Sequence, residues 1–305
     1  MPVKEVIRAD SASASPYAQR ARYVCNENGF AFSFPQVPAR QFLAERDRAF
    51  DPGLATGAVE LDASDALGTS QAATTPTLLC RYLRIRAGEE LRANRAAGSE
   101  VCYVMSGRGQ TRSANDQFEW AQGDVFCLAG GTECAHRANS DALLFSVTDE
   151  PLFAFCGMRA AAPGQSGVET VLWPAAEIDR HFDEVWARPA SEWATGAAVQ
   201  FSTRLTEPSF ATTPVLNVSI NTLAAGCDQR PHRHNGVAVT LAIQGEDIHS
   251  MIDGQRVDWS TGAAQITPAT TMHSHHNRGK QRMRSLVIQD ESLHLYTRTP
   301  GFSFD

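Results

Sequence analysis

Residues 226–245 read GCDQRPHRHNGVAVTLAIQG, and residues 262–277 read GAAQITPATTMHSHHN. His232 and His234 are two residues apart, so both side chains point to one face of an extended strand. His273 follows after a hairpin and a further strand, which brings the chain back beside that pair in an antiparallel barrel. Three imidazoles on one side of a metal ion leave its other side open. We therefore predict a metal site at His232, His234 and His273; the alternative for an isolated pair of this spacing is a polar surface strand.

An internal repeat organises the chain around these stretches. Residues of one half recur 138 positions later in the other: Thr75, Pro76, Leu78, Gly88 and Gly107 become Thr213, Pro214, Leu216, Gly226 and Gly245. Gly123 pairs with Gly262 at an offset of 139, which places one extra residue in an intervening turn. The sequence thus contains two halves of the same design, laid end to end.

Each half reads as short strands separated by Gly and Asp turns. Residues 215–223 alternate in polarity, and Asp253-Gly254 is a strong hairpin signal between two extended runs. This pattern predicts an all-β fold of barrel or jelly-roll type. Residues 177–186, after Pro174, favour a helix in a linker whose flexible part is 163–167. We expect an N-terminal extension over 1–70 that packs on the barrels and wraps the first, a first barrel over 71–160, a linker over 161–200 and a second barrel over 201–305.

The composition bounds the class of protein. The chain has 305 residues, of which 43% are hydrophobic and 20% charged, as in ordinary soluble globular proteins. A formal net charge of −7 argues against nucleic acid or an anionic membrane as the main partner. No apolar run approaches the ~20 residues of a membrane helix, and the first residues, MPVKEVIRADSASAS, lack the apolar core of a signal peptide. Seven dispersed cysteines are typical of free thiols in a reducing cytoplasm, so we expect a cytoplasmic protein.

The histidine stretches carry a resemblance to a known superfamily. Gly226 to Gly245, enclosing His232 and His234, resembles the first cupin motif. Gly262, Pro268, His273 and Asn277 fit the second motif, with Thr270 where a glycine is usual. The resemblance covers roughly residues 75–150 and 213–298 and implies two tandem cupin barrels (double-stranded β-helices). The general cupin site adds a glutamate ligand after the second histidine, but residues 235–239 contain no carboxylate. Three neutral ligands favour an anionic substrate that chelates the metal through two oxygens.

Within the cupins, these motifs are most similar to those of the gentisate 1,2-dioxygenase and salicylate dioxygenase family. Those bicupins use Fe(II) and molecular oxygen to cleave aromatic rings between a carboxylated and a hydroxylated carbon, and they commonly associate into dimers or tetramers. The resemblance implies that His275 assists substrate binding, as a catalytic residue. The alternative is that His275 makes a hydrogen bond that supports the metal site.

The first half departs from that family, whose metal site usually lies in the first cupin. The repeat places Asn94, Ala96 and Cys134 opposite His232, His234 and His273. His136 matches His275, and Glu100 occupies the usual cupin glutamate position, yet neither has the usual partners. We therefore expect a structural first barrel without metal and one Fe(II) per chain in the C-terminal cupin.

The substrate residues depart from the family as well. Thr240 stands where the family commonly places a carboxylate-binding arginine, and Arg204 could replace it or be an ordinary surface arginine. Asn217, Ser219 and Asn221 share one strand face, which is either the wall of a substrate cavity or a solvated face. The resemblance implies a ring-cleaving dioxygenase acting on a gentisate- or salicylate-like acid with O2. The alternatives are a Lewis-acid isomerase, hydrolase or lyase acting on a small chelating acid, and a non-catalytic cupin that binds a small ligand.

Overall fold

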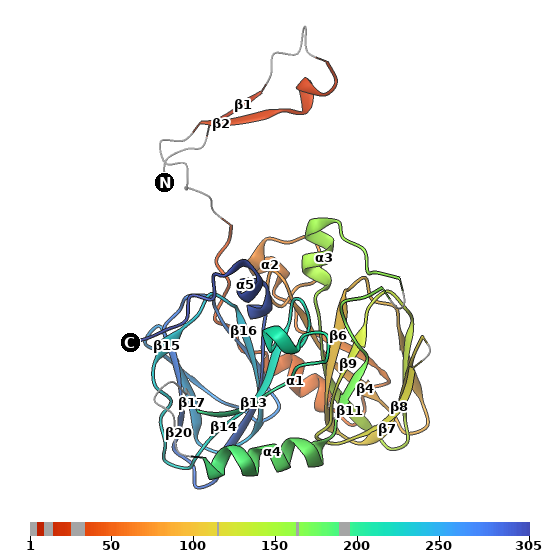
Figure 1. Ribbon diagram of the computed structural model, residues 1–305, viewed down its shortest axis with the longest axis vertical. Coiled ribbons are helices and arrows are strands. Elements are labelled where there is room, and N and C mark those ends of the chain that lie inside the picture. The colour runs from red at the N-terminus through yellow and green to blue at the C-terminus, as the bar shows by residue number, and fades with distance from the viewer. Residues whose placement is uncertain (1–4, 9–14, 26–33, 115, 163–164, 189–195) are drawn as a thin grey trace. The chain divides into compact units, whose positions relative to one another are not determined.

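The computed structural model describes residues 5–8, 15–25, 34–114, 116–162, 165–188 and 196–305. The chain divides into two compact units, residues 1–35 and residues 36–305. In the first unit, β1 (Glu5–Arg8) and β2 (Arg22–Cys25) form an antiparallel pair, with a 3-10 helix over Ala18–Arg20 between them. The second unit contains both barrels (Figure 1).

The first barrel consists of two antiparallel sheets. The strand order in its six-stranded sheet is β12-β9-β6-β11-β4-β3 and in its four-stranded sheet β5-β10-β7-β8. The strands are β3 (Gly57–Glu60), β4 (Leu79–Ile85), β5 (Glu90–Ala93), β6 (Ser99–Ser106), β7 (Arg108–Ser113), β8 (Asp116–Ala121), β9 (Val125–Ala129), β10 (Cys134–Ala138), β11 (Ala142–Thr148) and β12 (Val171–Trp173). The helices near this barrel are α1 (Leu43–Phe50), α2 (Ser64–Leu67) and α3 (Glu150–Cys156).

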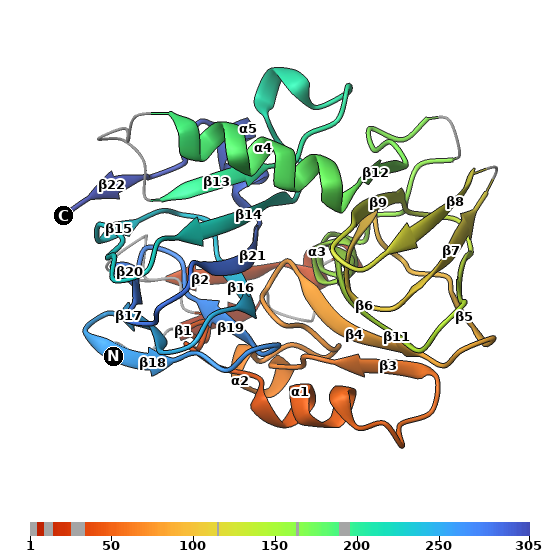
Figure 2. The same ribbon diagram turned by 90° about the horizontal axis from the view of Figure 1, so that it is seen from below.

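The second barrel repeats the design with two five-stranded sheets, in the orders β13-β14-β21-β16-β19 and β18-β17-β20-β15-β22. Its strands are β13 (Ala197–Gln200), β14 (Asn217–Leu223), β15 (His232–Arg233), β16 (Ala238–Gln244), β17 (Ile248–Ile252), β18 (Gln255–Asp258), β19 (Ala264–Thr267), β20 (His273–Asn277), β21 (Met283–Gln289) and β22 (Ser303–Phe304). A 3-10 helix spans Glu207–Ser209, and α5 spans Glu291–Thr297. The predicted pair of tandem cupin-like barrels is confirmed (Figure 2).

Strand β14 shows why its sequence alternates. Val218 and Ile220 are fully buried in the core, whereas Asn217, Ser219 and Asn221 on the other face are half-buried. The side chains of successive residues point to opposite faces of a strand, so one face packs and the other remains available to a cavity. Asp253 and Gly254 turn the chain between β17 and β18, as the hairpin signal predicts.

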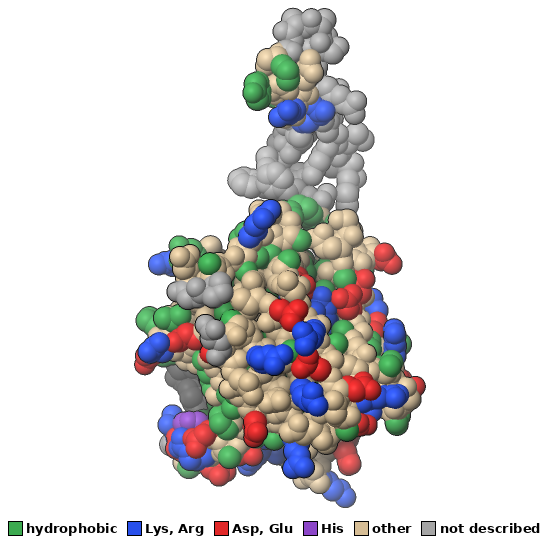
Figure 3. Space-filling view, turned by 90° about the vertical axis from the view of Figure 1, so that its right-hand side faces the viewer, with side chains coloured by type: hydrophobic (Ala, Val, Ile, Leu, Met, Phe, Trp, Pro, Cys, Tyr) green, Lys and Arg blue, Asp and Glu red, His purple; other side chains and the backbone are tan. Residues whose placement is uncertain are grey.

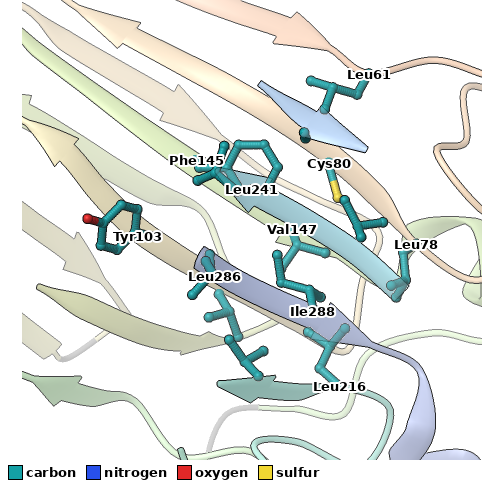
Figure 4. Close-up of a cluster of buried hydrophobic side chains, with 14 of the residues drawn as sticks. Leu61, Leu78, Cys80, Tyr103, Phe145, Val147, Leu216, Leu241, Leu286 and Ile288 are labelled. Atoms are coloured by element: carbon teal, nitrogen blue, oxygen red, sulfur yellow. The ribbon is translucent and has the colours of Figure 1, made fainter. Parts of the chain in front are cut away.

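One hydrophobic core joins the two barrels. Leu78, Cys80, Phe145 and Val147 of the first half belong to the same buried cluster as residues of the second half: Leu216, Leu241, Leu286 and Ile288 (Figure 4). The larger sheet of the first barrel therefore packs against the sheet of the second barrel that contains β14, β16 and β21. Burial of aliphatic and aromatic side chains on both sides is the main stabilising term at such a junction.

The linker contributes a helix, and the strands on either side of it pair with the two barrels. The predicted helix over 177–186 is confirmed as α4 (Ala175–Ala187), which begins directly after Pro174. Strands β12 and β13, which flank this helix, pair with β9 of the first barrel and β14 of the second. Sequence analysis missed both edge strands. Residues 163–164 of the expected flexible stretch lie outside the described residues.

The segment before the first barrel makes backbone hydrogen bonds with strands of both barrels. Strand β3 pairs with β4 of the first barrel, as an extension wrapping that barrel would. Residues 40–42, however, lie along β19 of the second barrel: Phe42 N–H donates to Ala264 O at 2.9 Å, and Ile266 N–H donates to Arg40 O at 2.8 Å. This stretch therefore packs on the second barrel as well, because β19 offers an unpaired sheet edge that backbone groups can satisfy.

The outer surface next to the first barrel carries interspersed charges of both signs, without a large single-sign patch in the view of Figure 3. Among the described residues, none of the helices is long and apolar enough to cross a membrane.

Candidate metal centre

Three buried imidazoles meet inside the second barrel. His232 on β15 is paired with His273 on β20, and His234 follows directly after β15. The ring centroids of His232 and His273 are 4.3 Å apart, and those of His234 and His273 are 4.9 Å apart. One nitrogen from each ring lies within 4.8 Å of the corresponding nitrogens of the other two. The three predicted ligands are thus brought together, although they come from sequence stretches on opposite sides of a hairpin.

Backbone carbonyls fix the protonation of all three rings. The Nδ1 atoms of His232, His234 and His273 lie 3.0, 2.8 and 3.0 Å from the carbonyl oxygens of Arg230, Gly236 and Thr271. A carbonyl oxygen only accepts, so each Nδ1 carries the hydrogen and each Nε2 keeps a lone pair. Metal-binding histidines are oriented in this way by the hydrogen bond that their other ring nitrogen makes. The donor set therefore fits a divalent transition metal.

The electrostatics of the cluster support the same conclusion. Burial is the largest cause that lowers the imidazole pKa values, to about 4 for His234 and about 2 for His273, with the neighbouring rings adding to the effect. Burial also lowers the pKa of His232. All three rings are neutral at neutral pH, which is the form that binds a metal. Within the described residues, no carboxylate oxygen joins this group of potential ligands.

His275 lies two residues beyond His273 on the same face of β20. Its ring is buried, and its centroid lies 6.1 Å from that of His273. The intervening Ser274 and the next residue, His276, bond to each other at 2.9 Å, and His276 Nδ1 lies 2.6 Å from a carboxylate oxygen of Asp228. The backbone is therefore extended here, with His275 facing inward and His276 lying against the more exposed Asp228.

A cavity of about 270 Å³ opens beside the cluster. All four inward histidines contribute to its wall, together with Ser219, Asn221, Gln229, Thr240, Gln289 and Glu291 among others. No lysine or arginine is among the lining residues, all of which the structure describes. A negatively charged ligand would therefore find its positive charge in the metal and its hydrogen bonds in neutral side chains.

The predicted substrate residues divide into two groups. Ser219, Asn221 and Thr240 line this cavity, whereas Asn217 is not among its lining residues. Arg204 is not among the lining residues of this cavity; its side chain is 86% exposed and bonds Glu169 at 2.8 Å, which favours the alternative of a surface arginine. Its turn lies outside the barrel, where a linker carboxylate holds the guanidinium away from the cavity.

Two cavity residues escaped sequence analysis. Gln289 Nε2 lies 3.0 Å from His234 Nε2, the atom that would bind a metal. Glu291 Oε2 accepts a hydrogen bond from Gly236 N–H at 2.9 Å, and burial raises the pKa of its carboxyl to about 7. For Glu291 a signal existed, since Asp290-Glu291 repeats Asp149-Glu150 of the first half. Nothing in the sequence marks Gln289.

The first barrel holds a second polar cluster that the sequence did not predict as a unit. Potential ligand atoms of Glu100, Cys134 and His136 lie within 4.8 Å of one another, and all three residues are buried. Arg95 Nε donates to Glu100 Oε1 at 3.1 Å. Burial tends to raise the pKa of the Glu100 carboxyl, but the charge of Arg95 reverses this and lowers it below its usual value. A guanidinium thus already supplies the cation that this buried carboxylate needs.

Comparisons with known proteins agree with this geometry. Residues 219–289, which include all three histidines, match the Cupin_2 family of cupin domains. The chain is 41% identical over 96 residues to 5-aminosalicylate 1,2-dioxygenase from Comamonas sp, which is 30% of this chain and 26% of that protein. It is 29% identical over 89 residues to gentisate 1,2-dioxygenase from Streptomyces sp, covering 29% and 25% of the two chains. The matches span about a quarter of the length of these relatives.

Solved structures resemble nearly the whole chain. Salicylate 1,2-dioxygenase from Pseudaminobacter salicylatoxidans superimposes with a TM-score of 0.72 over 92% of both chains, at 16% identity. A variant of that enzyme in complex with gentisate gives a TM-score of 0.72 over 89% of this chain and 88% of its own, at 14% identity. At this identity the likeness establishes the fold. The protein therefore has a bicupin fold, and its second barrel holds a three-histidine cluster. Over the 96 and 89 matched residues its sequence is similar to 5-aminosalicylate and gentisate 1,2-dioxygenases, as its motifs predict.

Proposed function

We propose that this protein is a non-haem Fe(II) dioxygenase that cleaves the ring of a hydroxylated aromatic carboxylic acid with O2. His232, His234 and His273 would hold the metal, one ion per chain, in the C-terminal cupin. The observation that carries the proposal is that three histidines in the cavity wall each keep a lone pair on Nε2. No carboxylate belongs to this group of described ligand atoms. An Fe(II) ion in such a site supplies open positions for a chelating substrate and O2 and a route for electrons between them.

The protein's own contribution is orientation in a polar cavity. Ser219, Asn221 and Thr240 line the cavity and offer neutral hydrogen-bond donors and acceptors to substrate oxygens. His275 is placed to contact a substrate bound beside His273. The cavity volume of about 270 Å³ suits a single-ring acid rather than a polycyclic one.

The cavity also favours one kind of ring substituent. Glu291 lines the wall, and no lysine or arginine balances its charge there. A second carboxylate on the ring would meet this carboxyl unfavourably, whereas an amino or hydroxyl group could donate a hydrogen bond to it. This supports 5-aminosalicylate and gentisate, the substrates in the names of two relatives, ahead of ring dicarboxylates; salicylate is the third candidate.

The experiment is oxygen uptake after anaerobic loading with Fe(II), using 5-aminosalicylate, gentisate and salicylate in parallel. The proposal expects stoichiometric O2 consumption with at least one acid and none in its absence. Loading with Mn(II), Ni(II) or Zn(II) provides the metal control, since affinity alone does not select iron. Turnover without O2 consumption would instead indicate a Lewis-acid isomerase, hydrolase or lyase, and binding without turnover a non-catalytic cupin.

Cell location and assembly belong to the same proposal. The six cysteines that the structure describes are free, which supports a reducing compartment and thus the cytoplasm. We propose a homo-oligomer, dimer or tetramer, with the aromatic acid and O2 as the partners that matter for activity. Sedimentation of the iron-loaded protein would measure its oligomeric state.

A further inference from the structure

The buried hydroxyl of Ser250 lies within hydrogen-bond distance of three side chains, one of which is His275. Ser250 Oγ on β17 lies 2.9 Å from His275 Nδ1, 2.7 Å from Trp259 Nε1 and 2.7 Å from Gln265 Nε2. Ser250, Gln265 and His275 are all at most 5% exposed, so water does not compete for these groups. The hydrogen bonds to the Ser250 hydroxyl must therefore be made among these four side chains and not with water.

The donor and acceptor capacities leave one arrangement. An indole N–H only donates, and the Gln265 amide nitrogen also donates, so both lone pairs of the Ser250 oxygen are occupied. Its one hydrogen must then go to His275 Nδ1. Turning the Gln265 amide around would leave its N–H groups buried without an acceptor, whereas the present orientation leaves only its Oε1 without a partner. Orphaned buried N–H groups are the rarer of the two.

We propose that Ser250, held by Trp259 and Gln265, fixes His275 as a neutral ring with its hydrogen on Nε2, aimed into the cavity. This is the opposite tautomer to that of His232, His234 and His273. With a hydrogen on Nε2, His275 cannot be a ligand through that atom and does not take a proton from the substrate. It donates a hydrogen bond to a substrate oxygen, and Ser250, Trp259 and Gln265 act as positioning residues.

The first barrel contains the same connection at equivalent positions. Thr111 Oγ1 lies 2.8 Å from His136 Nδ1 and accepts from Trp120 Nε1 at 2.9 Å. Phe126 stands where the second barrel has Gln265, so there the indole alone donates to the hydroxyl. His136 faces Cys134 rather than a substrate cavity, its Nε2 lying 3.7 Å from that sulfur. The repeat therefore supplies a natural control: threonine can occupy the serine position and keep the connection.

The test is the histidine tautomer, measured by two-bond 1H–15N NMR on the zinc-loaded protein labelled with 15N-histidine. His275, assigned by loss of its signals in His275→Gln, is expected to show the hydrogen on Nε2, while the three metal-binding rings show it on Nδ1. Ser250→Ala is expected to lose the fixed tautomer and Ser250→Thr to retain it. In the iron-loaded protein, Ser250→Ala should lower kcat on the order of tenfold, the loss of one directed hydrogen bond. Metal content should stay unchanged, and Ser250→Thr should remain within about twofold of wild type.

A hydrogen on Nδ1 of His275 in the wild-type spectrum would overturn the proposal, and this measurement needs no variant to fold. So would a Ser250→Ala protein that keeps both the wild-type tautomer and the wild-type kcat. The kinetic arm rests on the proposed dioxygenase function, but the spectrum does not. Absence of O2 uptake with every acid would contradict that function and leave the tautomer result standing.

Discussion

At the scale of single residues, two histidines on one strand of the second barrel are suited to different functions, metal binding and substrate binding. His273 and His275 both face inward from β20, yet the first has a backbone carbonyl at Nδ1 and the second a hydroxyl. The partner at Nδ1 decides whether Nε2 accepts or donates, and hence whether a ring suits a metal or a substrate oxygen. Substitutions can therefore distinguish metal binding from catalysis.

His275→Ala is expected to keep near-normal metal content and to lose about 10²-fold or more in kcat/KM, as for a positioned proton or hydrogen-bond donor. Steady-state O2 uptake and elemental analysis of the same preparation measure both quantities. The matched control is His276→Ala, whose side chain points the other way and should change neither. If His276→Ala were the damaging change and His275→Ala the harmless one, the assignment on this strand would be reversed.

His232→Ala and His273→Ala are each expected to abolish tight metal binding and activity. A site with three ligands that loses one imidazole holds a labile ferrous ion poorly, while the strand ladders do not depend on the metal. Far-UV circular dichroism should therefore remain that of the wild type. A variant that retained both iron and turnover would show that the ligand set is wrong.

At the scale of elements, the two repeats differ in which site residues they contain. Both barrels retain an Asp-Glu pair at the start of a helix, Asp149-Glu150 at α3 after β11 and Asp290-Glu291 at α5 after β21. Only the second keeps three inward histidines at the metal position. In the first, Asn94 and Ala96 are exposed, and Arg95 bonds the buried Glu100 instead.

This arrangement predicts one metal per chain and a structural role for Arg95. Arg95→Leu should destabilise the protein by about 3 kcal/mol, because it leaves the Glu100 carboxylate buried without its cation. Urea unfolding measures the change. Arg92→Leu, an exposed neighbour that bonds Glu133 at 3.3 Å, should cost less than about 0.5 kcal/mol. Two tightly held metal equivalents in the wild type, or no stability difference between the variants, would contradict this assignment.

Much of this architecture follows from local sequence, and the exceptions have a common cause. The two-residue spacing of His232 and His234, the alternation in β14 and the Asp253-Gly254 turn are local signals, and each predicted its structure. The contribution of Gln289 depends on the register of β21, and the pairing of residues 40–42 with β19 depends on a partner over 200 residues away. Contacts between distant segments leave little trace in a single sequence.

At the scale of the whole molecule, the shared core implies that the two barrels stabilise each other. Phe145 of β11 is 1% exposed, stacks edge-on against Tyr82 at 5.3 Å and belongs to the cluster that includes Leu286 and Ile288. Tyr82 itself donates its hydroxyl hydrogen to Gly262 O of the second barrel at 2.7 Å. Stability of the second barrel, which holds the proposed metal site, therefore depends on residues of the first barrel.

Phe145→Ala is expected to lower the free energy of unfolding by about 3–5 kcal/mol, the usual effect of emptying a phenylalanine site in a core. Metal release from the second barrel should shift to the same lower urea concentration as the loss of secondary structure. The matched control is Phe155→Ala, whose ring is 75% exposed. Metal release at the wild-type urea concentration would show that the barrels unfold independently.

The pairing of residues 40–46 with the second barrel also sets an order of events during synthesis. Gln41 Nε2 donates to Asp258 O, a partner 217 positions later in the chain, and Arg46 donates to Thr261 O at 2.9 Å. At roughly 5–20 residues per second, the ribosome needs about 10–40 s to make that interval. For all of that time the early segment lacks its partners in the second barrel, and the first barrel emerges with its share of the common core uncovered. Completion of the native structure therefore waits until the second barrel has been synthesised, and chaperones that bind nascent chains have a long window in which to act on this one.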